Sequence, residues 1–421
     1  MSDSHRKLSA KIRIVDESGK AITRAIVKYK LTNHEFLFGC GAFDFVPYCT
    51  DMPADLLKFF TETKTANRGF YEERCNRWLE LFNYGTLPFY WAGYEPQEGN
   101  VQHESRMNAA KYLQDNGRKV KGHPLCWHTE CADWLMKYDN KTIMDKQLAR
   151  INRDVGAFKG VIDMWDVINE TVIMPVYDRY DNAVSRICKE YGRLTLIKEV
   201  FDAAHAANPD AVLLINDFNL SEDYRKVIDE CLEHGVPISA IGIQSHQHQG
   251  YKGMDWMNDV IDRFKVFDLP LHFTENTLVS GQIMPAHIVD LNDYQVDSWP
   301  TTPDGEERQS REWVEMYTRV WEEPLVEAIT GWDFADGAWL HAPSGLVRED
   351  NSPKPSFENL KELVHNKWTS SGEAVTDDNG TVTIEGYRGE YELTINGKPY
   401  CYNLTKSANS TNDIIMLKSL R

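Results

Sequence analysis

The chain has 421 residues, 42% of them hydrophobic, which is ample for a full core and long for one ordinary domain. Its formal net charge of −18 at pH 7 would repel nucleic acid and anionic membrane surfaces. No apolar run approaches the roughly 20 residues that a membrane-spanning helix requires. We therefore expect no nucleic-acid or membrane partner, and one large domain accompanied by a small accessory unit.

The start of the chain is polar, with no apolar stretch behind it, so the sequence as written predicts no signal peptide. On that basis we expect a cytoplasmic protein, or a secreted one if a leader has been removed. The eight cysteines form no Cys-x-x-Cys pair, and several lie in apolar segments. They indicate buried free thiols in a reducing compartment rather than a disulfide framework.

Both ends of the chain have the pattern of short β-strands. Residues 8–31 alternate apolar and polar side chains around Ser18 and Gly19, which predicts a hairpin with its turn there. Residues 370–421 contain further alternating segments with Asn-Gly turns, typical of half a β-sandwich. Because each end alone has too little apolar surface to be stable, we expect residues 1–35 and 369–421 to form one small β-sandwich domain.

Between these ends, residues 36–368 repeat a strand-then-helix pattern. Helical periodicity is clearest at residues 186–206, 223–234 and 309–321, and a long loop with Pro and Gly, typical of a lid or an insertion, spans residues 278–308. Eight alternations predict an α/β protein with a (β/α)8 TIM barrel, with a doubly wound open sheet as the alternative. The apolar strand candidates are residues 36–40, 87–91, 119–123, 161–167, 211–215, 239–243, 269–274 and 328–332.

Two of these strands run into a glutamate. The fourth continues to Asn169 and Glu170, and the seventh stops at Glu275. The C-terminal ends of the strands form the active face of a β/α barrel. A double-carboxylate mechanism needs one acid that protonates a leaving oxygen and a second that attacks or stabilises the cation that forms. A lone glutamate at a strand end would fit a salt bridge on the barrel rim equally well.

Six motifs in a coherent order resemble glycoside hydrolase family 10, the family best known for endo-β-1,4-xylanases. The likeness covers roughly residues 36–366, nearly the whole barrel, and one such motif alone would be weak. In this sequence the motifs are Gly-His-Pro-Leu-Cys-Trp-His at 122–128, Trp-Asp-Val-Ile-Asn-Glu at 165–170, Ile-Asn-Asp-Phe-Asn at 215–219, Ile-Gly-Ile-Gln-Ser-His at 241–246, Thr-Glu at 274–275, and residues 332–339 with Pro-Lys-Pro at 353–355.

The resemblance implies a retaining hydrolase that needs no cofactor and acts on a carbohydrate, β-1,4-xylan or its oligosaccharides. Glu170 would be the acid/base and Glu275 the nucleophile. Asn169 would hydrogen-bond the 2-hydroxyl of the reacting sugar, a bond that strengthens in the transition state, although an Asn there could instead cap the next turn. Gln244 and His246 would orient the nucleophile. A non-xylan β-glycosidase and a non-catalytic carbohydrate-binding protein are the alternatives.

Aromatic residues in the same motifs would shape the cleft. The resemblance makes His123 and Trp127 the floor of the reacting subsite, and Trp332 and Trp339 its lining. Aromatic faces bind the apolar faces of sugar rings. Outside these motifs, a Trp near a strand end is more often simply part of a core.

Two departures from the family pattern affect the expected specificity and charge. After the second strand the family commonly has a Glu-Asn pair and a Lys before a Trp, which grip the next sugar, whereas residues 86–91 here read Thr-Leu-Pro-Phe-Tyr-Trp. A site without those hydrogen-bonding groups loses selectivity for a plain xylose chain, so we expect a different glycone, a decorated chain or an apolar aglycone. The aspartate that commonly backs the sixth-strand histidine is Thr277 here, which should support a charged His246 less well.

His246 and His248 also have the spacing of metal ligands, and His128 and Glu130 are nearby in the barrel order. Metal-dependent hydrolases on this fold use such pairs. No further set of histidines and carboxylates completes a shell in the sequence, so we expect no catalytic metal.

Overall fold

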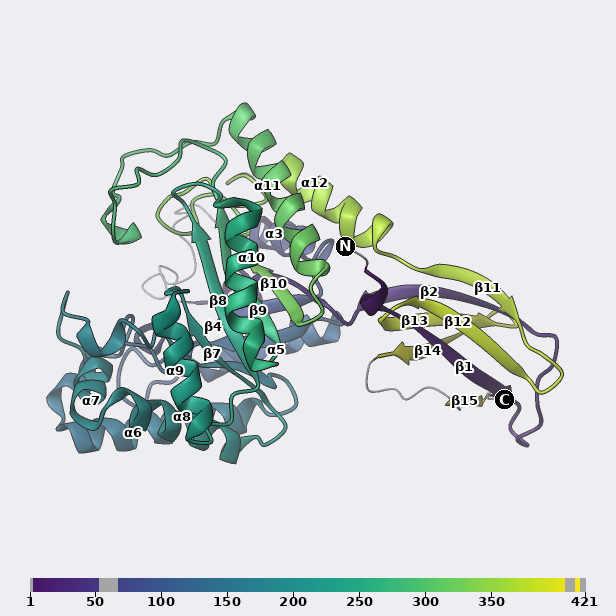
Figure 1. The fold of residues 1–421 in the computed structure, drawn as a ribbon, viewed down its shortest axis with the longest axis horizontal. Helices are drawn as coiled ribbons and strands as arrows, with labels where there is room; N and C mark the ends of the chain where they lie inside the picture. Colours follow the sequence, from purple (N-terminus) through teal and green to yellow (C-terminus); the bar gives the residue numbers. More distant parts are fainter. Residues whose placement is uncertain (1–2, 53–66, 406–412, 417–421) are drawn as a thin grey trace. The chain divides into compact units, whose positions relative to one another are not determined.

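The computed structural model describes residues 3–52, 67–405 and 413–416. The chain forms two compact units (Figure 1). The accessory unit comprises Met1–Leu37, Trp321–Pro324 and Leu360–Arg421, and the barrel unit comprises Phe38–Val320 and Leu325–Asn359. The domain boundaries expected after residues 35 and 368 stay predictions, because compactness alone does not show that a unit folds independently.

The barrel unit is built on parallel strands that close in the order β10-β3-β4-β5-β6-β7-β8-β9. The predicted (β/α)8 barrel is therefore confirmed, and the open doubly wound sheet is wrong, because β10 pairs with β3 and no edge remains. Most positions along these strands are buried, which explains their continuous apolar runs. The strands are β3 (Leu37–Gly41), β4 (Tyr84–Pro88), β5 (Lys119–His123), β6 (Met164–Asn169), β7 (Val212–Asp217), β8 (Ala240–Gln247), β9 (Leu271–Leu278) and β10 (Val326–Gly331).

Helices follow the strands, and α8 packs on β6 and β7 (Figure 1). Several begin at a side chain that accepts a hydrogen bond from a backbone N–H of the first turn, such as Asp139 before α6 and Ser221 before α9. The helix predicted at residues 186–206 is two helices, because Gly192 between them has a φ of +87°. The helices are α1 (Phe45–Cys49), α3 (Arg68–Leu79), α4 (Trp91–Tyr94), α5 (His103–Asp115), α6 (Asn140–Phe158), α7 (Ala183–Tyr191), α8 (Arg193–Ala207), α9 (Glu222–Glu233), α10 (Gly253–Phe264), α11 (Pro303–Trp321) and α12 (Pro355–Glu362).

The second barrel strand lies three residues earlier than predicted, at Tyr84–Pro88 rather than 87–91. Phe89, beyond its end, is fully buried, and its ring centroid lies 5.2 Å from that of Phe158 and 4.9 Å from that of Trp165. The apolar run continues past the end of β4 because the segment that follows is also buried. Hydrophobic periodicity alone therefore does not show where the strand ends.

The accessory unit is a pair of sheets built from both ends of the chain, as predicted. One sheet has the order β12-β1-β15 and the other β11-β2-β13-β14, so each combines an N-terminal strand with C-terminal ones. Between β13 and β14, Asn396 and Gly397 have φ values of +51° and +77°, as the predicted Asn-Gly turn requires. The strands are β1 (Lys7–Val15), β2 (Ile26–His34), β11 (Ser371–Val375), β12 (Thr381–Tyr387), β13 (Gly389–Ile395), β14 (Lys398–Leu404) and β15 (Asp413–Met416).

The hairpin predicted at residues 8–31 is wrong. A tight turn does form at Gly19, which has a φ of +80°, and Val15 bridges Ala21 across it. The chain then crosses to the other sheet, so β1 pairs with β12 while β2 pairs with β11 and β13. The turn residues were recognised correctly, but strands from the distant C-terminal segment supplied the pairing partners.

No described helix combines the length and the apolar character needed to cross a membrane. The eight cysteines are all free, as expected, and only Cys401 is exposed. The compartment stays a prediction.

Candidate active site

The ends of the barrel strands bring the two predicted glutamates onto one face. Glu170 directly follows β6, and its side chain is 15% exposed. Glu275 lies inside β9 rather than at its end, because the pairing of β8 with β9 continues to Leu278, and its side chain is 5% exposed. Both carboxyl groups are thus largely removed from water, where their charges interact strongly.

Polar groups on three strands surround the carboxyl group of Glu275. Asn216 Nδ2 on β7 donates to its Oε1 at 2.7 Å, and His246 Nε2 on β8 lies 3.1 Å from its Oε2. His123 Nδ1 on β5 is 3.9 Å from Oε1. Burial opposes ionisation, but the attraction of His123 and the hydrogen bond from His246 outweigh it and hold the pKa of Glu275 below its usual value. This carboxyl group is poised as an anion.

The carboxyl group of Glu170 is poised in the opposite state. Burial raises its pKa to about 8, and the charges of Glu275 and Asp217 act in the same direction. Trp127 Nε1 donates to Oε2 at 2.8 Å and partly opposes the rise. Glu170 also has a φ of +59°, a left-handed backbone conformation that is rare for this residue type and is found often at functional sites. At neutral pH, Glu170 therefore carries a proton beside an ionised Glu275.

A row of amide side chains connects the two glutamates. Asn169 Nδ2 donates to Glu170 Oε1 at 3.3 Å, and Asn169 Oδ1 accepts from Asn216 Nδ2 at 2.7 Å. Asn216 uses the same nitrogen for Glu275, while its Oδ1 accepts from Thr274 at 2.7 Å. Gly242 makes room for this side chain, since a Cβ there would lie 2.2 Å from Asn216 Oδ1. Asn216 was not among the predicted site residues, although its place near a strand end was a usable signal.

The two residues expected to orient the nucleophile differ in their contacts. His246 contacts Glu275 through Nε2 and Thr277 Oγ1 through Nδ1 at 2.9 Å, so it links the carboxyl group to the next inward-facing side chain of β9. Gln244 pairs with Glu275 in the strand register, but its Nε2 donates to Asn169 Oδ1 at 2.8 Å. Any effect of Gln244 on the nucleophile is therefore indirect, through Asn169.

The predicted floor and lining residues gather around the same carboxyl groups. The ring centroid of Trp332 lies 5.1 Å from that of His123 and 5.9 Å from that of His246. Trp339 lies 4.8 Å from His246, and Trp127 contacts Glu170 directly. All nine predicted residues therefore belong to one contiguous site.

Tyr90, which was not among the predicted site residues, adds an aromatic group to the site. Its ring centroid lies 5.7 Å from that of His123, 5.6 Å from that of Trp127 and 6.0 Å from that of Phe43. Burial raises the pKa of its hydroxyl well above the usual range, and the charge of Glu275 adds to the rise. Next to His123, where the family pattern has hydrogen-bonding groups, this chain therefore has a wall of aromatic rings.

Below the carboxyl groups, a buried ion pair lies inside the barrel. Lys121 Nζ on β5 lies 2.7 Å from Asp166 Oδ2 on β6, and the same oxygen lies 2.7 Å from His123 Nδ1. Neither Lys121 nor Asp166 is exposed. Neither residue was predicted as part of the site, because a lysine or an aspartate within a strand resembles an ordinary outward-facing residue.

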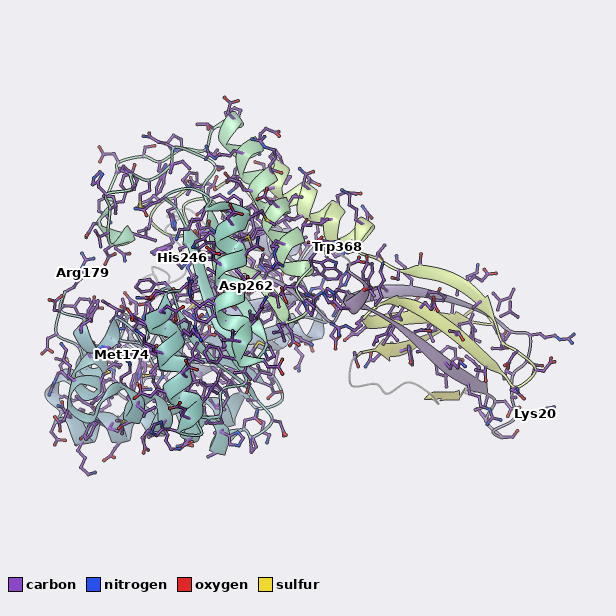
Figure 2. All side chains as sticks on the ribbon, in the orientation of Figure 1. Lys20, Met174, Arg179, His246, Asp262 and Trp368 are labelled. Carbon is purple, nitrogen blue, oxygen red and sulfur yellow. The ribbon has the colours of Figure 1, made fainter. Side chains whose placement is uncertain are left out.

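The long loop predicted at residues 278–308 is shorter, because α11 begins at Pro303. It has a small core of its own, formed by Val279, Met284 and Trp299 with Ala342. Arg179, which is labelled in Figure 2, lies in the loop after β6. It forms ion pairs with Asp290 and Asp293 of the long loop. The loops that follow the two glutamate-bearing strands are thus tied together, and the role of lid or insertion stays a prediction.

The possible metal ligands do not form a cluster. Among the described residues, no group of three or more His, Cys, Asp or Glu side chains is arranged to hold a metal ion. His248 is fully buried, neither of its ring nitrogens has a hydrogen-bond partner, and burial lowers its pKa to about 3. Burial likewise lowers the pKa of His128 to about 4, so both rings are neutral at physiological pH.

A closed parallel barrel with a protonated and an ionised carboxylic acid on its C-terminal face has the arrangement of a glycoside hydrolase. The family model described as glycosyl hydrolase family 10 matches residues 89–363. The chain belongs to that family.

The relatives of this chain include xylanases and an anti-sigma factor. A β-1,4-xylanase of Dictyoglomus thermophilum is 28% identical over 270 residues, covering 58% of this chain and 71% of that protein. The anti-sigma-I factor RsgI6 of Acetivibrio thermocellus is 24% identical over 419 residues, covering 96% of this chain. The chain spans only 47% of the length of that second relative.

Solved structures share the fold. The crystal structure of xylanase 10B from Thermotoga petrophila in complex with xylobiose superposes with a TM-score of 0.62 at 21% identity, over 79% of this chain and 95% of that one. Xylanase 10B from Thermotoga maritima gives a TM-score of 0.60, also at 21% identity, over 79% and 96% of the two chains.

Proposed function

We propose that this protein hydrolyses β-1,4-xylan or xylo-oligosaccharides by double displacement, with retention at the anomeric carbon. The observation that carries the proposal is the opposite protonation of two carboxyl groups in one hydrogen-bonded set, since the pKa of Glu170 is raised to about 8 and that of Glu275 is lowered. A retaining mechanism needs this pair of states. Carbohydrate as the substrate class follows from the family, and the names of the xylanase relatives support xylan.

In the first step, a carboxylate oxygen of Glu275 attacks the anomeric carbon while Glu170 gives its proton to the leaving oxygen. The glycosidic C–O bond breaks, and a glycosyl ester forms on Glu275. In the second step, Glu170, now ionised, takes a proton from water as the water oxygen attacks the same carbon. The ester bond breaks, Glu275 is again a carboxylate and Glu170 again carries its proton.

The surrounding residues have roles that follow from their contacts. Asn216 and His246 hold the nucleophile through hydrogen bonds of 2.7 and 3.1 Å. The amide of Asn169 lies between the two glutamates, where it can meet the 2-hydroxyl of the reacting sugar. Because groups fixed before the reaction need no reorganisation in the transition state, such contacts accelerate the chemical step.

A second candidate substrate is a β-glycoside other than plain xylan. Tyr90 favours it, because the ring is packed against His123 and Trp127 and offers one hydroxyl where a xylose chain would need several partners. A decorated chain or an apolar aglycone fits such a wall better. Robust hydrolysis of unsubstituted linear xylan, at rates normal for endo-xylanases, would count against this candidate.

A non-catalytic carbohydrate-binding protein is the rival from another class. One relative that matches 96% of this chain is named as an anti-sigma factor and not as an enzyme. The test compares wild type with Glu275→Gln on activated aryl β-glycosides, with Glu233→Gln on the outer helix α9 as the matched control. We expect turnover by wild type and by the control, and none by Glu275→Gln. Zero turnover by wild type, by Glu275→Gln and by the control across a panel of sugars would favour the binding protein. Loss of wild-type turnover on addition of a chelator would indicate a metal hydrolase.

A further inference from the structure

Lys121 is a charged residue in a place where β/α barrels usually have apolar ones. Its side chain is 0% exposed on β5, and its Nζ lies 2.7 Å from Asp166 Oδ2. Removing a lysine ammonium from water costs several kcal/mol unless a partner compensates, and a hydrophobic pair of similar volume would often be as stable. Stability alone therefore does not account for this ion pair inside the barrel.

The ion pair extends to the predicted nucleophile. Asp166 Oδ2 also lies 2.7 Å from His123 Nδ1, and the same nitrogen is 3.9 Å from Glu275 Oε1. These contacts form one buried line of groups in which basic and acidic side chains alternate. Its members are, in order, Lys121, Asp166, His123 and Glu275. Each member of such a line stabilises its neighbours, and at low dielectric these interactions are strong.

We propose that Lys121 is a positioning residue for catalysis: its ammonium offsets the charge of Asp166, which can then hold His123 with less opposition to the ionisation of Glu275. Lys121 acts through Asp166 and His123 and does not touch the substrate. The inference rests on the proposed hydrolytic function and adds to it the group that maintains the charge of the nucleophile.

The electrostatic balance around Glu275 supports this role. The titratable groups that interact with it include His123 from β5, Asp166 from β6 and His246 from β8. They also include Glu170, directly after β6, and Tyr90, after β4. The charge of Asp166 acts to raise the pKa of Glu275, against the effects of the two histidines. Burial also raises the pKa of Asp166, but Lys121 and then His123 lower it below its usual value, so Asp166 stays ionised.

A neighbouring histidine does not duplicate the ammonium. His272 on β9 interacts electrostatically with both Lys121 and Asp166, but burial lowers its pKa to about 3. His272 is therefore neutral at working pH and does not itself compensate the charge of Asp166. Among these groups, Lys121 is the one whose charge most lowers the pKa of Asp166.

The test is the pH dependence of kcat/KM for wild type, Lys121→Met and Lys121→Arg on an activated aryl β-glycoside. Loss of the ammonium leaves Asp166 as an uncompensated anion, so we expect the acidic limb to move to higher pH by about one unit in Lys121→Met. Because the charge of Asp166 acts on Glu275, the limb is read as an apparent value for the pair. Lys121→Arg keeps a cation and should leave the limb within a few tenths of a unit of wild type.

The matched control is Lys354→Met. Lys354 is also 0% exposed and ion-paired, with its Nζ 2.5 Å from Asp336 Oδ1 and 2.8 Å from Ser280 Oγ, but it has no contact with this line. It should lose a comparable amount of stability without moving the acidic limb. An unmoved limb in folded Lys121→Met, or the same shift in both lysine variants, would overturn the inference.

If Lys121→Met fails to fold, Lys121→Met combined with Asp166→Asn carries the test, because no lone buried charge remains. The acidic limb of kcat/KM in the double variant should then stay close to that of wild type. A shift of a full pH unit would contradict the charge-offsetting role. Wild type provides the separate test of the proposed function. Absence of wild-type turnover refutes the hydrolase, whereas active wild type with an unmoved Lys121→Met limb refutes only the role of Lys121.

Discussion

Replacing Trp127 by Phe removes the indole N–H that donates to Glu170 Oε2 at 2.8 Å and keeps an aromatic ring in its place. That hydrogen bond stabilises the ionised form of Glu170 and lowers its pKa from what burial alone would impose. A hydrogen bond to a charged group contributes about 1.5–3 kcal/mol, and about 1.4 kcal/mol corresponds to one pKa unit. We therefore expect the alkaline limb of kcat/KM, near pH 8 in wild type, to move up by about one unit.

The assay is the pH–rate profile on an activated aryl β-glycoside between pH 4 and pH 10. Trp339→Phe is the control, because Trp339 packs on His246 at 4.8 Å and has no hydrogen bond to Glu170. It should change kcat/KM without moving the alkaline limb. An alkaline limb that stays in place or moves down in Trp127→Phe, or that moves equally in both variants, would refute the account of Glu170 as a buried proton donor tuned by this bond.

Three further changes test the surrounding groups. Asn216→Ala removes a donor from Glu275 and from Asn169, so kcat/KM should fall about 10- to 100-fold with little change in folding, and a fall of less than threefold would contradict the bridging role. Glu170→Gln should melt at a higher temperature than wild type. A folded-state pKa raised to about 8 gives wild type a proton-linked stability that is present at low pH and lost as pH rises through that value. The gain in melting temperature of Glu170→Gln over wild type should therefore appear at pH 9 and shrink toward pH 4. A pH-independent difference in melting temperature would argue against burial as the cause. Thr277→Asp places an anion beside His246 Nδ1, and the pH–rate profile should change; an unchanged profile would show that the hydroxyl and the carboxylate serve equally well.

Much of the fold could be predicted because local patterns agreed with the tertiary structure. β5 falls on the predicted residues 119–123, and the Asn-Gly turn after β13 has the backbone that its residues favour. The wrong hairpin at the N-terminus shows the limit of such patterns. β1 and β2 carry strand and turn signals, but their partners come from the other end of the chain, and nothing local specifies that.

Most of the candidate site could be predicted because its residues match motifs or end an apolar run, and a few buried residues were missed. Glu170 and Asn169 followed an apolar run and were visible, whereas Lys121 and Asp166 occupy alternating positions in β5 and β6 and were not. Tyr90 was quoted only as a departure, because the second strand was placed three residues too late. The direction of each pKa shift depends on burial and neighbours, which sequence alone does not give.

In the proposed mechanism, Glu275 becomes covalently bonded to the sugar while Glu170 moves the proton. The decisive experiment is mass spectrometry of the protein after reaction with a 2-deoxy-2-fluoro glycoside of the sugar that wild type hydrolyses. We expect one glycosyl adduct on the peptide that contains Glu275, and none in Glu275→Gln. An adduct on another residue, or steady hydrolysis with inversion and no adduct, would refute double displacement through Glu275.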